Sequence, residues 1–287
     1  MTTPSLTANV PSAKIADTPS TPPILTIDDG RALVRLNRPR EHNRLEPDDL
    51  AALRDIFDRV DKDTSIRVLI ITGTGKSFSS GFHIGALAER KLGAERKLGA
   101  ERTSGKRGDD DPDMFAKTVD RLEMLRVPTI AALNGGVYGG ATDLALACDF
   151  RIGVTGTRMF MPAARLGIVY YPSGLRRYVN RLGLGPAKRL FLTAEPIETD
   201  ELKRIGYLDE VVTPDRLLPH VEALAATIAA NAPMAVAGNK RALNDIAAGT
   251  FDVEAINALR QACAASEDHK EGLEAWAEKR KAEFKGR

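Results

Sequence analysis

Along the first two thirds of the chain, short apolar runs alternate with apolar stripes at helical spacing. Two runs around the Asp28–Gly30 turn within 23–36 predict a β-hairpin. A helix is expected from Pro47, because the following apolar positions (Leu50, Leu53, Ile56, Phe57, Val60) fall on one helical face. Compact apolar runs predict buried strands at 67–71, 129–133 and 150–154. Strands alternating with helices indicate an α/β core.

Beyond Pro186 the pattern is mainly helical, with segments at 196–206, 217–230, 234–248 and 253–284. Residues 1–22 are rich in Ser, Thr, Pro and Ala, which is typical of a disordered tail. We therefore expect three parts: a disordered tail at 1–22, an α/β core at 23–196 and a helical C-terminal region at 197–287.

A tandem six-residue repeat interrupts the core at 89–106, where the chain reads ERKLGA-ERKLGA-ERTSGK. A period of six does not match the helical period of 3.6, so its leucines form no stable stripe. The composition favours a mobile, solvated loop over 87–113. The alternative is a lid whose basic residues lie near an anionic group of a substrate.

Composition narrows the classes of function. The 287 residues carry 41 Lys+Arg and 39 Asp+Glu, a net charge of +2 that argues against a nucleic-acid partner. No apolar run reaches the ~18–20 residues of a membrane span, so no membrane partner is expected. Two cysteines, Cys148 and Cys263, fit a reducing compartment, and we expect a cytoplasmic protein. Scattered histidines and cysteines predict no metal site.

Two glycine-rich turns follow predicted strands, at 73–83 and at 134–143. The second turn opens a helix, whose first N–H groups are free and lie at the positive end of the dipole. Two such turns at neighbouring strand ends could direct two N–H groups at one oxygen, as in an oxyanion hole. The alternative is that both are only tight connections.

At these turns the sequence resembles the crotonase (enoyl-CoA hydratase/isomerase) superfamily. The resemblance covers about 24–286, in the family's order. It implies a spiral of ββα units with a helical C-terminal trimerisation region. The matching segments are NRPxxxNRL (37–45), ITGTGKSFSSGFHI (71–84), PTIAALNGGVYGGATDLALACDFRIG (128–153), RLGIVYYPSGLRRYVNRLG (165–183), LTAEPIETDELKRIGYLDEVV (192–212) and ASEDHKEGLEAWAEKRKAEFKG (265–286).

The resemblance implies an acyl-CoA substrate whose thioester enolate is stabilised by the backbone N–H groups of Phe82 and Gly140. It implies no cofactor apart from the coenzyme A of the substrate, and a homotrimer or a dimer of trimers. By motif position, the coenzyme or substrate is contacted by Arg44, His83, Ile84, Trp276 and Lys279, the last two reaching a neighbouring subunit.

The acid/base positions depart from the family. The first hydratase glutamate matches Asp143, which is still a carboxylate, whereas the second matches Ala163, which cannot exchange a proton. A further carboxylate position of the family matches Tyr171. Asp143 could alternatively serve only to stabilise its own helix. Glu123, on the helix before the second turn, is expected on a solvated face.

These observations favour an enzyme of the hydratase/isomerase family with Asp143 as the acid/base and weak or absent hydration of crotonyl-CoA. The first alternative is other crotonase-type chemistry, such as thioester or carbon–carbon bond hydrolysis or decarboxylation, using Tyr171 or His83. The second is a non-catalytic acyl-CoA-binding protein, which the alanine at 163 motivates.

Overall fold

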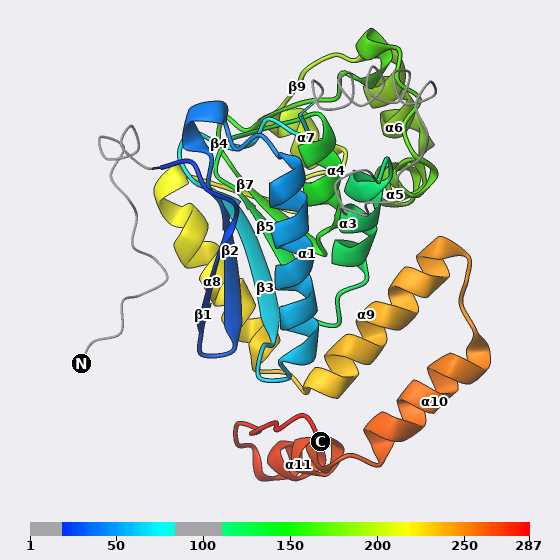
Figure 1. The fold of residues 1–287 in the computed structure, drawn as a ribbon. Helices are drawn as coiled ribbons and strands as arrows, with labels where there is room; N and C mark the ends of the chain where they lie inside the picture. Colours follow the sequence, from blue (N-terminus) through cyan, green and yellow to red (C-terminus); the bar gives the residue numbers. More distant parts are fainter. Residues whose placement is uncertain (1–18, 84–110) are drawn as a thin grey trace, which may run out of the picture.

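The computed structural model describes residues 19–83 and 111–287, which fold around two sheets (Figure 1). The large sheet has the order β1-β2-β3-β5-β7-β10 and the small sheet the order β4-β6-β8-β9. The large-sheet strands are β1 (Ile24–Asp28), β2 (Arg31–Leu36), β3 (Val68–Gly73), β5 (Thr129–Leu133), β7 (Phe150–Val154) and β10 (Glu210–Val212). Those of the small sheet are β4 (Ser77–Ser79), β6 (Gly136–Tyr138), β8 (Arg158–Phe160) and β9 (Ile197–Glu198).

The predicted hairpin is the antiparallel pair β1–β2, and every later pair in the large sheet is parallel. All residues of β3 and β5 are buried, as expected of parallel strands covered on both faces. The chain alternates between the sheets: β3, β5 and β7 of the large sheet are followed by β4, β6 and β8 of the small one. This alternation confirms the predicted spiral of ββα units.

Helices cover both faces of the large sheet (Figure 1). α8 packs its buried Leu217, Val221 and Ala225 against apolar residues of the sheet on one face. α1 lies on the other side, with the predicted stripe of Leu50, Leu53, Phe57 and Val60 buried and Ile56 partly buried. The helices are α1 (Pro47–Lys62), α3 (Met114–Glu123), α4 (Gly140–Ala147), α5 (Pro172–Leu182), α6 (Leu184–Thr193), α7 (Thr199–Arg204), α8 (Leu217–Ala229), α9 (Pro233–Ala248), α10 (Val253–Ala264) and α11 (Glu267–Glu278). Short 3-10 turns are η2 (Pro39–Glu41), η4 (Ala163–Leu166) and η5 (Pro214–Arg216).

Beyond residue 196 the sequence pattern predicted helices, whereas the structure also contains two short strands. β9 pairs with β8 and β10 pairs with β7, so this part of the chain completes both sheets. These strands have two and three residues, too few for a periodic signal. The predicted helix over 253–284 is two helices, α10 and α11, followed by a non-helical end.

The described part of the expected tail is bound to the core. The Thr21 N–H donates to the Asn37 carbonyl at 2.9 Å, and the Ser20 hydroxyl donates to Glu41 at 2.7 Å. Composition did not reveal these contacts, because they involve single polar atoms. The repeat at 89–106, and all of the predicted loop over 87–113 except its last three residues, lie outside the described residues.

None of the helices in 19–83 and 111–287 is by itself long and apolar enough to cross a membrane. A bent pair, Pro214–Ala229 with Pro233–Ala248, meets the length and composition together.

Candidate active site

The two glycine turns lie against each other. Gly81 has φ +90° and Gly139 has φ +53°, a backbone conformation that favours glycine. A Cβ placed on Gly81 would lie 3.0 Å from the Gly140 nitrogen and 3.3 Å from the Gly139 Cα. Only a residue without a side chain therefore permits this approach of the two turns.

Among the residues that the structure describes, two backbone N–H groups at this junction have no backbone acceptor. Phe82 forms a parallel bridge with Leu45, which uses the Gly81 carbonyl at 2.9 Å and the His83 N–H at 3.0 Å. Gly140 begins α4, where N–H groups have no intrahelical partner. Within 19–83 and 111–287, neither the Phe82 N–H nor the Gly140 N–H donates to a carbonyl. Both are therefore available to an oxygen atom of a ligand.

Asp143 lies in the first turn of α4 and is fully buried. Its carboxylate accepts a hydrogen bond from Arg177 Nη1 at 2.8 Å and a second from the Tyr171 hydroxyl. The N-terminal turn of α5 approaches closely, because a Cβ on Gly174 would lie 2.8 Å from Asp143 Oδ2. Asp143 is therefore more than a carboxylate that stabilises its own helix: it joins α4 to α5.

Arg177 is the centre of a buried ionic network formed by α3, α4 and α5. Besides Asp143 it binds Glu123 Oε1 through Nε at 3.0 Å and Asp120 Oδ1 through Nη2 at 2.7 Å. Glu123 is 8% exposed, so the expected solvated position was wrong. Asp120 and Glu123 stand three residues apart on one helix face beside buried Val119 and Leu122. Two acidic residues at this spacing beside buried apolar residues indicate a buried cation, and the sequence alone contains this pattern.

Burial and charge act in opposite directions on these groups. Burial raises the pKa of Asp143 above its ordinary value, although Arg177 and the Tyr171 hydroxyl oppose the rise. Burial alone would lower the pKa of Arg177, but Asp143 and Glu123 outweigh it and raise that pKa. Burial and the Asp143 charge raise the pKa of Tyr171. At neutral pH the arginine is therefore a cation and the phenol is protonated.

A row of aromatic rings leads from the first glycine turn to Asp143. The ring centroids of Phe82 and Phe115 are 5.7 Å apart, and those of Phe115 and Tyr171 are 6.1 Å apart. Tyr170 stacks on Tyr171 at 4.4 Å and contacts Tyr178 edge-on, so it belongs to the packed interior. Sequence analysis missed Phe115, because it stands alone beside the repeat segment.

The other predicted binding residues fall into separate groups. Glu46, which the sequence analysis did not single out, joins Arg44 Nε at 2.7 Å and His83 Nδ1 at 2.9 Å. This cluster is partly exposed beside the Leu45–Phe82 bridge. Ile84 lies outside the described residues.

Trp276 and Lys279 are not brought to the glycine turns. They stand on and directly after α11, which Figure 1 shows at the opposite end of the molecule from β4 and α4. Trp276 is 87% exposed.

In the described part of the chain the carboxylates that accompany Asp143, those of Glu123 and Asp120, are both bound to Arg177, and no metal-binding cluster is found. Ala163 is buried in η4. No group of three or more His, Cys, Asp or Glu side chains in 19–83 and 111–287 could hold a metal ion.

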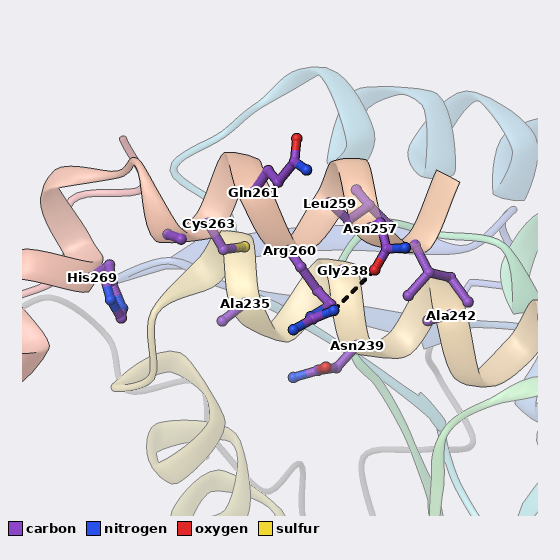
Figure 2. Close-up of a pocket in the computed structure, with 12 residues that line it drawn as sticks. Ala235, Gly238, Asn239, Ala242, Asn257, Leu259, Arg260, Gln261, Cys263 and His269 are labelled. Carbon is purple, nitrogen blue, oxygen red and sulfur yellow. Dashed lines mark hydrogen bonds between the residues drawn. The ribbon is translucent and has the colours of Figure 1, made fainter. Parts of the chain in front are cut away.

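A groove of about 540 Å³ lies elsewhere, between α9 and α10 (Figure 2). Its walls are largely small and apolar, with Arg260 donating to Asn257 at 2.9 Å inside it. The groove shares no residue with the glycine turns.

Comparison with known proteins shows the family of the chain. The family model described as "Enoyl-CoA hydratase/isomerase" matches residues 26–287. The chain is 35% identical to the crotonyl-CoA hydratase of Syntrophomonas wolfei over 271 residues, covering 91% of this chain and 96% of that protein. It is 36% identical to the short-chain-enoyl-CoA hydratase of Clostridium acetobutylicum over 270 residues, covering 89% and 95%.

A solved enoyl-CoA hydratase from Bacillus anthracis superposes with a TM-score of 0.78 at 28% identity, covering 93% of this chain and all of that one. The family match, the relatives and the shared fold place the chain in the crotonase superfamily. The chain belongs to the enoyl-CoA hydratase/isomerase family and is an enzyme of that family.

Proposed function

We propose that this enzyme binds an acyl-CoA thioester and stabilises the enolate formed from it. The observation that carries the proposal is the pair of available N–H groups, on Phe82 and Gly140, at turns that touch. A thioester oxygen bound by both donors would gain stabilisation as it becomes negative. Because both donors belong to the backbone, the aromatic side chain of Phe82 does not weaken this role.

Asp143 and Tyr171 are the proposed acid/base pair. The hydroxyl of Tyr171 donates to the carboxylate of Asp143, and Tyr171 is the partly exposed member. Arg177 holds the carboxylate in place from the opposite side. The Tyr171 oxygen can take a proton from one carbon of the acyl chain while its own phenol proton moves to Asp143. The reverse transfer, from Asp143 to Tyr171 and from Tyr171 to the carbon two positions along the acyl chain, completes a shift of the double bond.

One acid/base pair favours a proton shift along the acyl chain over efficient hydration. In a 1,3-shift a single group removes and returns the proton, whereas addition of water benefits from a second group that orients and protonates. By motif position, Ala163 replaces that second carboxylate. We therefore assign isomerisation of an enoyl-CoA as the main reaction, with slow hydration.

The experiment compares 3-enoyl-CoA isomerisation and crotonyl-CoA hydration in the wild-type enzyme and in Asp143→Asn. The substitution keeps the side-chain volume, and we expect kcat/KM to fall by about 10²- to 10⁴-fold. Tyr171→Phe should also lose activity, while Tyr178→Phe, which removes a buried phenol bound to Thr142, serves as the control.

Unchanged turnover in Asp143→Asn would overturn the acid/base assignment. Hydrolysis or decarboxylation of other thioesters, abolished by Tyr171→Phe or by His83→Ala, would favour the other crotonase-type reactions. Tight binding of acyl-CoA without turnover of any thioester would favour a binding protein instead.

Arg44 and His83 are the proposed contacts of the coenzyme on this chain. Glu46 bonds to both and fixes them at the partly exposed edge of the site. The Arg44 guanidinium suits a phosphate group, since its planar donors match phosphate geometry. Trp276 and Lys279 would serve the site of a neighbouring subunit, because α11 lies far from the glycine turns of its own chain.

A homotrimer, or a dimer of trimers, is the proposed assembly. Large apolar side chains are exposed on and between the C-terminal helices, among them Leu243, Ile246, Phe251 and Leu273. Exposed apolar side chains gathered on one part of a molecule are typical of an interface. The groove between α9 and α10 adds to this surface (Figure 2). Light scattering after size exclusion tests the assembly, and a mass of one chain would contradict it.

A further inference from the structure

The ring of Phe115 stands against the second glycine turn. A Cβ placed on Gly140 would lie 2.7 Å from Phe115 Cζ and 3.1 Å from Cε2, so the tip of the ring touches Gly140. The same ring neighbours Phe82 on one side and Tyr171 on the other. Phe115 therefore lies against both residues of the proposed oxyanion hole and against Tyr171 of the proposed acid/base pair.

We expect the acyl chain of a bound thioester to lie beside Phe115. In an enolate, the carbon atoms next to the thioester carbonyl lie within a few ångströms of the oxyanion donors. They must also lie near the group that moves the proton. Phe82 and Gly140 define the first end of that path and Tyr171 defines the second. Phe115 forms the wall between them.

Phe115 is part of a larger aromatic surface. Phe82, Phe115 and Tyr171 are all partly exposed, and each approaches the next. Aromatic rings gain about 0.5–1.5 kcal/mol from a stacked or edge-on aromatic partner beyond the burial of area. A flat conjugated group gains this contribution, whereas a puckered saturated ring of similar size does not.

We propose that Phe115 is a specificity-determining residue that selects acyl groups with an extended planar π-system next to the thioester. This inference rests on the proposed binding of acyl-CoA at Phe82 and Gly140. It names the class of acyl group, which the family membership leaves open.

The experiment measures binding by calorimetry of two matched thioesters, cinnamoyl-CoA and 3-cyclohexylacryloyl-CoA. They have the same carbon framework, but only the first is conjugated into a planar ring. We expect the wild-type enzyme to bind cinnamoyl-CoA about 3- to 10-fold more tightly. Phe115→Leu and Phe115→Met should bring the ratio of the two Kd values close to one. Phe191→Leu, which changes a ring packed on Tyr170 and Tyr178, should leave the ratio as in the wild type.

A wild-type ratio of one or less overturns the inference without any variant. A ratio that survives Phe115→Leu in folded protein overturns it as well. Because binding is measured, failure of the proposed reaction is distinguishable: the expected ratios without turnover would support the role of Phe115 and contradict the reaction. Absence of binding of both thioesters would overturn both.

Discussion

Around Asp143 the fold buries charge, whereas in the arm formed by α9, α10 and α11 it exposes apolar side chains. Arg177 is fully buried with Asp143 and Glu123 against it. In the arm, Leu243 is 66% exposed and Trp276 87% exposed. Each arrangement is unfavourable for an isolated chain. Buried ions lose their hydration, and exposed apolar side chains remain in contact with water.

The two regions differ in which interactions offset these unfavourable free energies. The buried charges are satisfied within the chain by ion pairs and hydrogen bonds of 2.7–3.1 Å. The exposed apolar side chains of the arm are left uncovered by the described residues, which supports the proposed contact with another subunit. Changes near Asp143 should therefore act on folding and chemistry, and changes in the arm on assembly.

The largest expected effect is that of Arg177→Met. It leaves Asp143 and Glu123 buried without their shared cation, and breaking such a pair costs about 3–5 kcal/mol. Urea unfolding measures the loss. The control is Arg176→Met, which removes a partly exposed pair with the same Glu123 and should cost about 0–1 kcal/mol. Equal losses in the two variants would contradict a network centred on Arg177.

Next in size is the double variant Leu243→Glu and Ile246→Glu on α9. Charges placed on the proposed interface should separate the subunits of the proposed assembly, so the mass from light scattering should fall to that of one 31.1 kDa chain. Each chain should stay folded by circular dichroism. Ile24→Glu, on the edge strand β1, exposes a charge at another apolar position and should leave the mass unchanged. Loss of assembly in both variants would argue against the arm as the interface.

A smaller effect is expected for the reactivity of the two cysteine thiols. One cysteine lies in the core and the other in the arm, so the experiment compares the two regions within one molecule. Burial raises the pKa of the Cys148 thiol to about 12, so its nucleophilic thiolate is scarce at pH 8. Iodoacetamide should leave Cys148 unmodified in folded protein and label it in urea, as followed by mass spectrometry. Cys263, partly exposed beside the groove of the arm, is the internal reference. Rapid labelling of Cys148 in the native state would show that the core opens.

The smallest effect concerns the end of the arm. Hydrogen bonds from Arg280 and from the Glu283 N–H lower the pKa of Glu271 to about 2. Since the folded pKa lies below the ordinary value, this contact stabilises the arm above about pH 4.5 and is lost as the pH falls toward 2. A carboxyl NMR titration should find the midpoint near 2, and Glu271→Gln identifies the signal. A midpoint near 4.5 would mean that the contact is absent in solution.

Much of the fold follows from local patterns. The strands at 129–133 and 150–154 and the helix from Pro47 formed as predicted, because their apolar periodicity and turn residues agree. The strands of the small sheet were missed. They have two or three residues each and depend on neighbours that come from distant parts of the chain.

The residues of the candidate site also divide into those that the sequence indicated and those that it did not. Phe82, Gly140, Asp143 and Tyr171 could be selected because the motifs around them resemble those of the crotonase superfamily. Arg177, Glu46 and Phe115 could not, since each matters only through a partner from another element. The expected solvated position of Glu123 was wrong for the same reason: its cation lies on α5, 54 residues later.

The sequence by itself determined the family and the longer strands and helices, and by motif position it placed alanine at 163. These are properties of residue types at given positions. Tertiary structure decided that Asp143 is bound by Arg177 and Tyr171, that the two glycine turns touch, and that Phe115 lies between them and Tyr171. Distances, burial and the resulting pKa shifts arise only when separate elements pack, so no local pattern encodes them.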